Sequence, residues 1–419
     1  MPILSLAWKS LLNRRFTAAL AVLSIALSLT LLLGVERVRH EARAAFASTI
    51  SGTDLIIGAR GGGVPLLLYS VFRVGNPTNN LSWESYQAIA AHPKVAWTVP
   101  LSLGDSHRGF PVLGTDLGYF EHYRYARERR LVFAQGRPFD DLYDAVLGAE
   151  VARALGYTLG ESIVVAHGAS DVSFARHADK PFRVVGILAR TGTPVDRTVH
   201  VSLEAIEALH VGWEAGAPIP GLIPSAERVR ALDLTPKAIT AALVGLESRV
   251  ATFEVQRHVN QYPREPLTAI LPGVALAELW RLIGMVENLL LVISGFVVLV
   301  SLLGMLTALL TSLNERRREM AILRAVGARP AHIYALVMGE AAFLTLLGAA
   351  LSLASLYALL ILTQPIIGDR LGVFLAIGSP AVTELALLGA VILAGLVVGS
   401  IPGYRAYQLS LADGLSLRI

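Results

Sequence analysis

The sequence predicts a membrane protein with four transmembrane α-helices and a large α+β extracytoplasmic domain inserted between the first and second helices. Hydrophobic residues make up 54% of the 419 residues and charged residues only 16%, which is too apolar for a soluble globular protein. Four apolar runs are each long enough to cross a bilayer. The net charge of +4 is explained by arginines at membrane edges, so nucleic-acid binding is not expected.

The first membrane helix is predicted at residues 16–35, about 20 apolar residues that can cover a bilayer core of roughly 30 Å. Residues 1–15 are expected to form an amphipathic helix, and Lys9, Arg14 and Arg15 hold it on the cytoplasmic side. A cleaved signal peptide is the competing interpretation. It is rejected because the apolar run exceeds that of a signal peptide and a charged stretch follows it.

Residues 36–275 contain no run that could span a membrane and form the extracytoplasmic domain. Short strands and helices alternate, which indicates an α+β fold large enough for two subdomains. The glycine cluster from Arg60 to Gly63 is expected to be a turn, because no Lys-Ser/Thr pair follows it as in a phosphate-binding loop. Residues 215–224, rich in Gly and Pro, are expected to be a mobile connection or a loop tip. The predicted elements are strands at 54–59, 95–103, 182–187, 199–201 and 239–246, and helices at 82–91 and 249–261.

A stalk helix is predicted at residues 276–288, with Leu276, Leu279, Trp280 and Ile283 on one face. No helix breaker separates it from the second membrane helix at 289–313. A continuous rod of this kind can carry motion from the membrane into the outer domain. The alternative is an interfacial helix that lies on the bilayer.

The rest of the chain is predicted to alternate between membrane helices and short connections. Residues 314–332 carry five arginines against two glutamates, the bias of a cytoplasmic loop, so both termini are also cytoplasmic. A Gly395-x-x-x-Gly399 motif is interpreted as helix packing only. The remaining segments are membrane helices at 333–362 and 382–401, an outer loop at 363–381 and a cytoplasmic tail at 402–419.

Two ionisable residues fall inside the predicted spans. Glu384 is expected at the outer end of its helix, at the level of the lipid headgroups. Glu340 lies about two turns inside the third helix, where a buried charge is costly and therefore a candidate functional group. We interpret Glu340 as an intramembrane brace against Arg329 or a neighbouring helix, because a lone carboxylate cannot form a proton relay.

Residue patterns for catalysis and metal binding are missing. The sequence has no Gly-x-x-x-x-Gly-Lys-Ser/Thr, no Gly-x-Ser-x-Gly and no metalloprotease motif, so no catalytic residues are assigned. It has no cysteine, which excludes disulfides and cysteine-based zinc sites. The ten histidines, among them His107 and His122, are scattered and are interpreted as surface residues rather than a metal site.

The loop sequence Glu315-Arg-Arg-Arg-Glu-Met-Ala-Ile-Leu-Arg-Ala-Val-Gly-Ala328, with Gly339-Glu340-Ala341 beyond it, resembles the signature of FtsX/MacB/LolC-type ABC transporter permeases. The segment around Ile401-Pro402-Gly403-Tyr404-Arg405-Ala406 is similar to the end of the same family. The resemblance implies that the loop is a coupling helix for an ABC ATPase subunit, in which ATP and Mg would bind. The residues in the ATPase groove would be Glu319, Met320, Leu323 and Arg324, with Gly327 ending the helix.

The resemblance also implies a location and partners. A second permease copy, identical or related, would complete a dimer in the bacterial inner membrane, and a periplasmic or lipoprotein partner is possible. Such permeases work by mechanotransmission, in which ATPase closure moves the periplasmic domains to export or extract a substrate. Two other classes stay open: an FtsX-like regulator of a periplasmic partner or hydrolase, and a membrane-anchored enzyme. Lipoprotein, lipid, peptide, siderophore and metal-related cargo are all compatible with the sequence.

Overall fold

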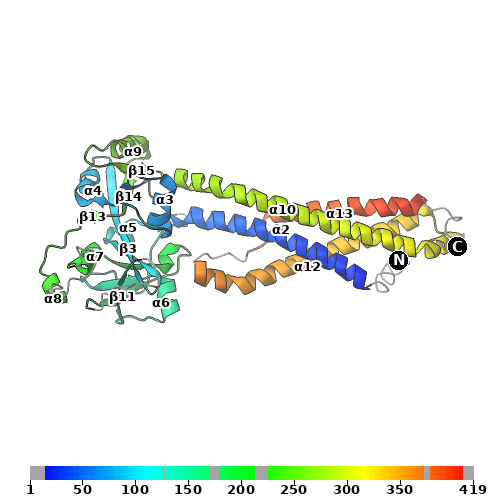
Figure 1. Ribbon diagram of the computed structural model, residues 1–419, viewed down its shortest axis with the longest axis horizontal. Coiled ribbons are helices and arrows are strands. Elements are labelled where there is room, and N and C mark those ends of the chain that lie inside the picture. Colours follow the sequence, from blue (N-terminus) through cyan, green and yellow to red (C-terminus); the bar gives the residue numbers. More distant parts are fainter. Residues whose placement is uncertain (1–14, 127, 169–178, 213–224, 372–377, 409–419) are drawn as a thin grey trace. The chain divides into compact units, whose positions relative to one another are not determined.

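The computed structural model describes residues 15–126, 128–168, 179–212, 225–371 and 378–408. The chain divides into two compact units (Figure 1). The first, here called the helical unit, consists of residues 1–41, 283–365 and 375–419, and the second, the α+β domain, of residues 42–282 with 366–374. The predicted N-terminal amphipathic helix, the connection at 215–224 and most of the C-terminal tail lie outside the described residues.

Four helices of the described chain are long and apolar enough to cross a membrane, and the α+β domain is inserted between the first two. The predicted fold class is therefore confirmed. The helices are α2 (Arg15–Thr49), α10 (Pro272–Glu315), α12 (Pro330–Leu371) and α13 (Val382–Gln408), and a short helix, α11 (Arg317–Ala325), lies between α10 and α12.

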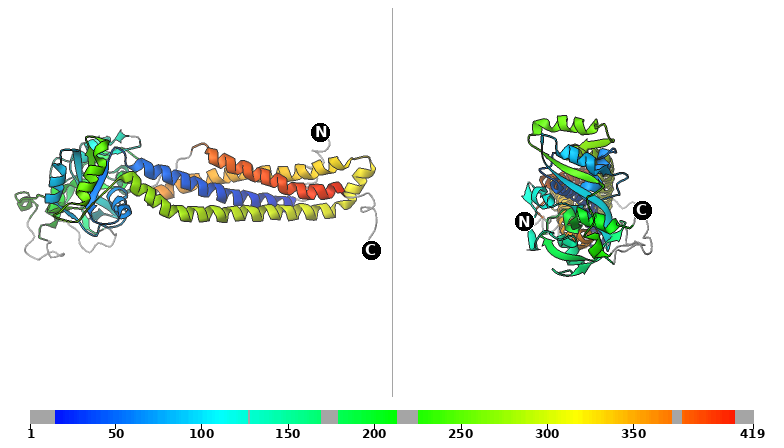
Figure 2. Two further views of the ribbon diagram at one scale, coloured as in Figure 1. Left: turned by 90° about the horizontal axis from the view of Figure 1, so that it is seen from above. Right: turned by 90° about the vertical axis from the view of Figure 1, so that its left-hand side faces the viewer.

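The four long helices pack side by side in the helical unit, as Figure 2 shows. Their shared core contains Ile25 and Leu29 of α2, Met305 of α10 and Leu344 of α12, all nearly inaccessible to solvent. Leucine, isoleucine and valine fill most of the faces that point away from this core, as expected of helices in lipid.

The α+β domain is built on a mixed sheet of 11 strands in the order β15-β1-β14-β3-β4-β12-β8-β11-β7, with β10 paired to β3 and β9 to β11. The β4–β12 and β8–β11 pairs are parallel, and the other neighbours are antiparallel. The strands are β1 (Leu55–Ala59), β3 (Val95–His107), β4 (Phe110–Thr115), β7 (Phe133–Gly136), β8 (Asp144–Leu147), β9 (Ser162–Ile163), β10 (Ala166–His167), β11 (Phe182–Leu188), β12 (Val199–Ser202), β14 (Ala241–Leu246) and β15 (Leu267–Ile270). Two small pairs are separate: β2 (Leu81–Ser82) with β13 (Ala238–Ile239), and β5 (Arg124–Tyr125) with β6 (Arg129–Arg130).

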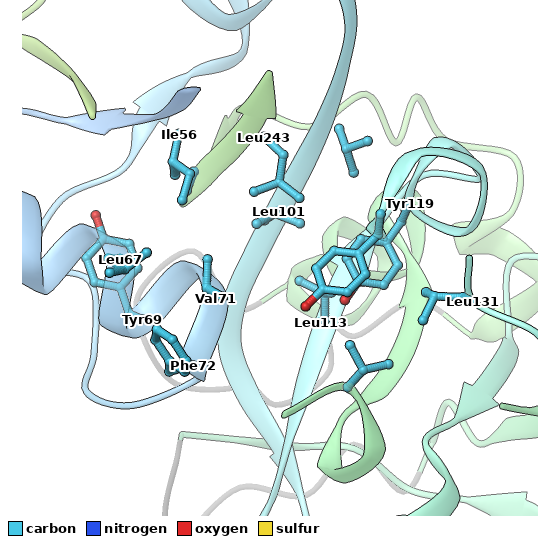
Figure 3. Close-up of a cluster of buried hydrophobic side chains, with 14 of the residues drawn as sticks. Ile56, Leu67, Tyr69, Val71, Phe72, Leu101, Leu113, Tyr119, Leu131 and Leu243 are labelled. Carbon is cyan, nitrogen blue, oxygen red and sulfur yellow. The ribbon is translucent and has the colours of Figure 1, made fainter. Parts of the chain in front are cut away.

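Short helices cover this sheet and close its apolar core. In one cluster, Leu101 and Leu113 of neighbouring strands pack with Tyr119 and with Phe72 (Figure 3). Ser82 caps α4 by accepting a hydrogen bond from the Ser85 amide, as its type and position predict. The helices are α3 (Gly63–Leu67), α4 (Trp83–Ala90), α5 (Gly118–His122), α6 (Ala149–Leu155), α7 (Leu203–His210), α8 (Ala226–Val229) and α9 (Thr252–Asn260), with single turns at η1 (Leu68–Phe72), η2 (Pro194–Arg197) and η3 (Arg249–Ala251).

Several element boundaries differ from the predictions. Helix α2 continues to Thr49 because the Glu, Arg and Ala residues beyond its apolar run are good helix formers, whereas α12 continues to Leu371 and α13 to Gln408 although Pro365 and Pro402 lie within them. Part of the predicted outer loop at 363–381 is therefore helical. Strand β15 has four residues and no marked alternation, so the sequence did not reveal it; pairing with β1 stabilises it.

Candidate functional site

Helix α11 begins and ends at sharp breaks in the backbone. Arg316 separates it from α10 with φ −99° and ψ 9°. At the other end, Gly327 has φ +104°, the Gly327 amide donates to the Arg324 carbonyl and the Ala328 amide to the Leu323 carbonyl. This pair of bonds is a Schellman motif, which glycine favours because its left-handed φ strains other residues. α11 is thus a discrete helix of nine residues.

One face of α11 is buried against the chain's own helices. Met320 is 3% exposed and belongs to a small apolar cluster with Leu313 of α10, Leu336 of α12 and Ala406 of α13. The cluster fixes α11 to three of the long helices by apolar burial.

The opposite face of α11 is exposed and carries an apolar pair. Ile322 is 52% exposed, and Val326, the C-cap residue directly after α11, is 84% exposed. The Val326 amide donates to the Ile322 carbonyl four residues earlier, so the two side chains share one side of the helix. The Glu319 carboxylate, also exposed, precedes them. An apolar pair with a flanking charge is a surface that a protein partner can cover.

The residues expected in the partner's groove lie on different faces of α11. Glu319 is exposed, and Leu323 and Arg324 are half-buried. Met320 points inward, so its predicted place on the partner-facing side is wrong for this structure. The sequence could not separate the two apolar stripes, because Met320 with Leu323 and Ile322 with Val326 both have helical spacing.

Glu340 of α12 forms an ion pair with Arg316, the residue between α10 and α11. Its Oε2 atom lies 3.6 Å from Nη1 of Arg316, and Nε of Arg316 lies 2.9 Å from Oε2 of Glu319. Arg316 and Glu340 are 5% and 8% exposed. These contacts join Glu340 to Arg316, which lies between α10 and α11, and the brace against Arg329 or a neighbouring helix stays a prediction.

A second set of buried charges lies where α2 meets α13. Arg37 Nη1 lies 3.3 Å from Oε1 of Glu384, and the same guanidinium donates to the carbonyls of Gly378 and Ser379. Glu384 is 2% exposed, so its carboxylate is buried in protein, and its position at the level of the lipid headgroups stays a prediction. Burial is tolerable because the arginine compensates its charge.

The predicted stalk residues belong to the continuous helix α10. Within the α+β domain, the ring centroids of Trp280 and Phe46 lie 5.5 Å apart in an edge-to-face arrangement. The Arg43 guanidinium lies over the same indole. Leu279 is buried and Leu276 packs on the domain core, whereas Ile283 is exposed. Three of the four predicted stalk residues are therefore buried or half-buried, and Ile283 is 36% exposed.

Two histidines of the α+β domain are buried, which corrects their assignment to the surface. The ring of His107 bonds to the Val164 carbonyl at 2.7 Å and to the Tyr157 hydroxyl at 3.0 Å. His200 is fully buried beside Tyr119. Among the described residues, no group of three His, Cys, Asp or Glu side chains could hold a metal ion. These histidines serve packing and hydrogen bonding.

The α+β domain contains an open cleft of about 830 Å³ at the ends of β4 and β12. Its wall includes Trp83, Asp116 and Glu204, and five of its lining residues are carboxylates against one arginine. Burial, followed by the charge of Glu204, raises the pKa of Asp116 to about 6. The only lining arginine, Arg230, is committed to Asp141 at 2.9 Å. No sequence motif marks this cleft, because its wall comes from separate segments.

Two family models match this chain. A MacB-like periplasmic core domain matches residues 18–261, more than half of the sequence, and an FtsX-like permease C-terminal domain matches residues 291–411. The chain belongs to the FtsX/MacB permease family. The second match includes α11 and its flanking helices, so the resemblance of the loop is confirmed, and the four apolar helices make this permease a multi-pass membrane protein.

Curated relatives of the permease combine two functions in their names. This permease is 26% identical over 346 residues to the macrolide export ATP-binding/permease protein MacB of Bordetella avium (strain 197N). The match covers 79% of this chain and 48% of the relative. It is 29% identical over 175 residues to a probable export ATP-binding/permease protein of Pseudomonas fluorescens (strain Pf0-1), covering 41% and 25%. The permease spans about half the length of the first of these relatives.

Two solved structures are also similar to parts of the permease. The periplasmic region of MacB from Actinobacillus actinomycetemcomitans matches with a TM-score of 0.34 and 12% identity, over 55% of this chain and 94% of that structure. The extracellular domain of the noncanonic ABC-type transporter YknZ from Gram-positive bacteria matches with a TM-score of 0.30 and 14% identity, over 52% of this chain and 99% of that structure.

Proposed function

We propose that this chain is the non-catalytic membrane subunit of a MacB-type ABC transporter and that α11 is the docking site for a separate ATPase subunit. The observation that supports this most directly is the exposed pair Ile322 and Val326 on a helix whose other face is anchored. The relatives named as ATP-binding/permease proteins extend well beyond the matched region. Because no Walker A motif occurs here, ATP and Mg would bind in the partner.

The proposed mechanism transmits motion instead of opening a pore through the helices. ATP-driven closure of two ATPase subunits would displace α11, and the long helices would carry the displacement outward. Helix α10 is suited to this role, since its 44 residues extend about 66 Å without a break, more than twice the bilayer core. The outer α+β domain would then act on a substrate in the periplasm or the outer leaflet.

The proposed setting follows from the same family membership and the charge bias. Two permease copies, identical or related, would form a dimer in the bacterial inner membrane, with both termini cytoplasmic and the α+β domain periplasmic. Arginines at 316, 317, 318, 324 and 329 support a cytoplasmic position for the loop. One relative is named for macrolide export and another for probable export, and we extend to this chain the export of a substrate. A periplasmic or lipoprotein partner would take part in this export.

The test of docking places a charge on the exposed apolar pair of α11. The double variant Ile322→Asp with Val326→Asp buries two carboxylates in the proposed interface, which costs several kcal/mol and should abolish recovery of the ATPase. Tagged chain is purified from detergent-solubilised membranes, and co-purified ATPase is measured by mass spectrometry and hydrolysis. Leu323→Asp and charge reversal at Arg324, both at the edge of this face, should also abolish coupling without unfolding the chain.

Val250→Asp is the matched control. Val250 is 90% exposed in the α+β domain, so the same change there should leave ATPase recovery unaltered. Normal recovery with the Ile322/Val326 double variant would contradict docking on this face. Wild-type chain that recovers no ATPase under any condition would contradict the proposed function as a whole.

A further inference from the structure

The junction between α10 and α11 contains a buried cation shared by two carboxylates. Arg316 is 5% exposed; its Nε atom contacts Glu319 in the first turn of α11 and its Nη1 atom contacts Glu340 on α12. Arginine suits such a position because its planar group presents several donors in fixed directions. A single side chain thus links α11 to a residue ten positions into α12, about 15 Å along that helix.

The apolar contacts and the ion pair near Arg316 constrain α11 in different ways. The apolar cluster of Leu313, Met320 and Leu336 holds α11 against the bundle, but apolar burial has no direction and permits sliding. The ion pair between Arg316 and Glu340 fixes the position of the α10–α11 junction along α12, since the attraction weakens once the guanidinium and the carboxylate separate. A buried charge that loses its partner is strongly unfavourable, so the two groups are expected to move together.

We propose that Arg316 is a positioning residue that couples the movement of α11 to α12 through Glu340. The inference rests on the proposed function in one respect, that a partner displaces α11. Both α10 and α12 are joined to α11 through the backbone, and Arg316 adds a side-chain link to α12 ten residues beyond its start. A partner that binds α11 normally would transmit less motion when this link is removed.

The first experiment needs no partner protein. Because the sequence has no cysteine, cysteines introduced at Val326 and Leu346 are the only sites for spin labels, and both side chains are exposed. The distance distribution between the labels in the purified chain is measured by pulsed electron paramagnetic resonance. We expect the width of this distance distribution to increase about twofold in Arg316→Gln and in Glu340→Gln. The double variant should show little further broadening, because the effects of substituting two groups that act as a pair do not add.

The matched control for this measurement is Arg317→Gln, which removes an exposed arginine from the same loop. The distribution should remain as narrow as that of the wild type. Equal widths in Arg316→Gln and Arg317→Gln, or additive broadening in the double variant, would overturn the proposal. This result stands whether or not an ATPase binds the chain.

The second experiment uses the reconstituted complex with its ATPase. Arg316→Gln should retain ATPase binding while stimulation of hydrolysis by the permease falls about tenfold, a size typical of coupling between two sites. Arg316→Lys, which keeps the charge but not the two-armed geometry, should recover part of the stimulation. Unchanged stimulation in Arg316→Gln would overturn the proposal, whereas failure of the wild type to bind any ATPase would reject only the proposed function.

Discussion

At the scale of single residues, His200 shows how strongly the α+β domain constrains a titratable group. Burial, and then the charge of Arg73, lower its pKa from 6.5 to about 3. The centroid of the His200 ring lies 5.3 Å from that of the Tyr119 ring, and Nδ1 of His200 lies 3.3 Å from the carbonyl oxygen of Val146. Between about pH 3 and pH 6.5, His200 is therefore mostly neutral in the folded protein, whereas in the unfolded chain it would be mostly protonated.

The shift predicts acid sensitivity of the domain. Because the folded pKa is depressed, the unfolded state binds a proton first, and stability is lost as pH falls below 6.5 towards 3. Between pH 7 and pH 5, the protonation of His200 in the unfolded chain should lower the free energy of unfolding by about 2 kcal/mol. Urea unfolding of the detergent-solubilised chain, followed by tryptophan fluorescence, should show this loss in the wild type and a much smaller one in His200→Phe. Identical pH dependence in both would contradict the assignment.

At the scale of elements, the glycines of α13 allow it to approach α12 closely. A methyl group on Gly399 would lie 2.4 Å from Cβ of Ala341, and one on Gly395 would lie 2.6 Å from Oγ1 of Thr345. Gly389 of the same helix has no such neighbour. The motif is thus a packing feature, as predicted from the sequence.

The two kinds of glycine should respond differently to substitution. Gly399→Val forces α12 and α13 apart and should destabilise the chain by about 1–3 kcal/mol, the usual effect of overpacking. Gly389→Val adds the same side chain in open space and should change little. Thermal unfolding in detergent distinguishes them: equal midpoints for the two variants would show that the close approach is not required.

At the scale of the whole molecule, the proposed topology assigns α11 and the α+β domain to opposite sides of the membrane. Single cysteines replacing Arg318 and Val250 would be the only thiols in the chain, and both positions are exposed. In spheroplasts, a membrane-impermeant maleimide should label Val250→Cys at once and Arg318→Cys only after lysis. Labelling of both cysteines before lysis would contradict the topology.

Much of this architecture follows from local sequence. The apolar runs alone are sufficient to predict the four helices, because hydrocarbon requires about 20 apolar residues in a row. The Ser82 cap and the φ of Gly327 follow from residue type at a helix end. The helix ends were predicted less well, since propensity extends α2 beyond its apolar segment and α12 continues past Pro365.

The candidate site was only partly predictable. The sequence marked the loop, its arginines and Glu340, but it could not assign Arg316 as the partner of Glu340, 24 positions away. It also placed Met320 in the partner's groove and did not single out Ile322, although Met320 is 3% and Ile322 52% exposed. The buried histidines were missed for the same reason, since nothing near His200 in sequence indicates that the sheet encloses it.

Local sequence was sufficient to predict the number of spans, the insertion of the α+β domain and the family motif of the loop, because each depends on residues adjacent in the chain. Tertiary packing sets which side of α11 is free, which arginine pairs with Glu340 and which with Glu384, and which histidines lose contact with water. Those properties depend on segments far apart in sequence, and burial and ion pairing exist only once the segments have packed together.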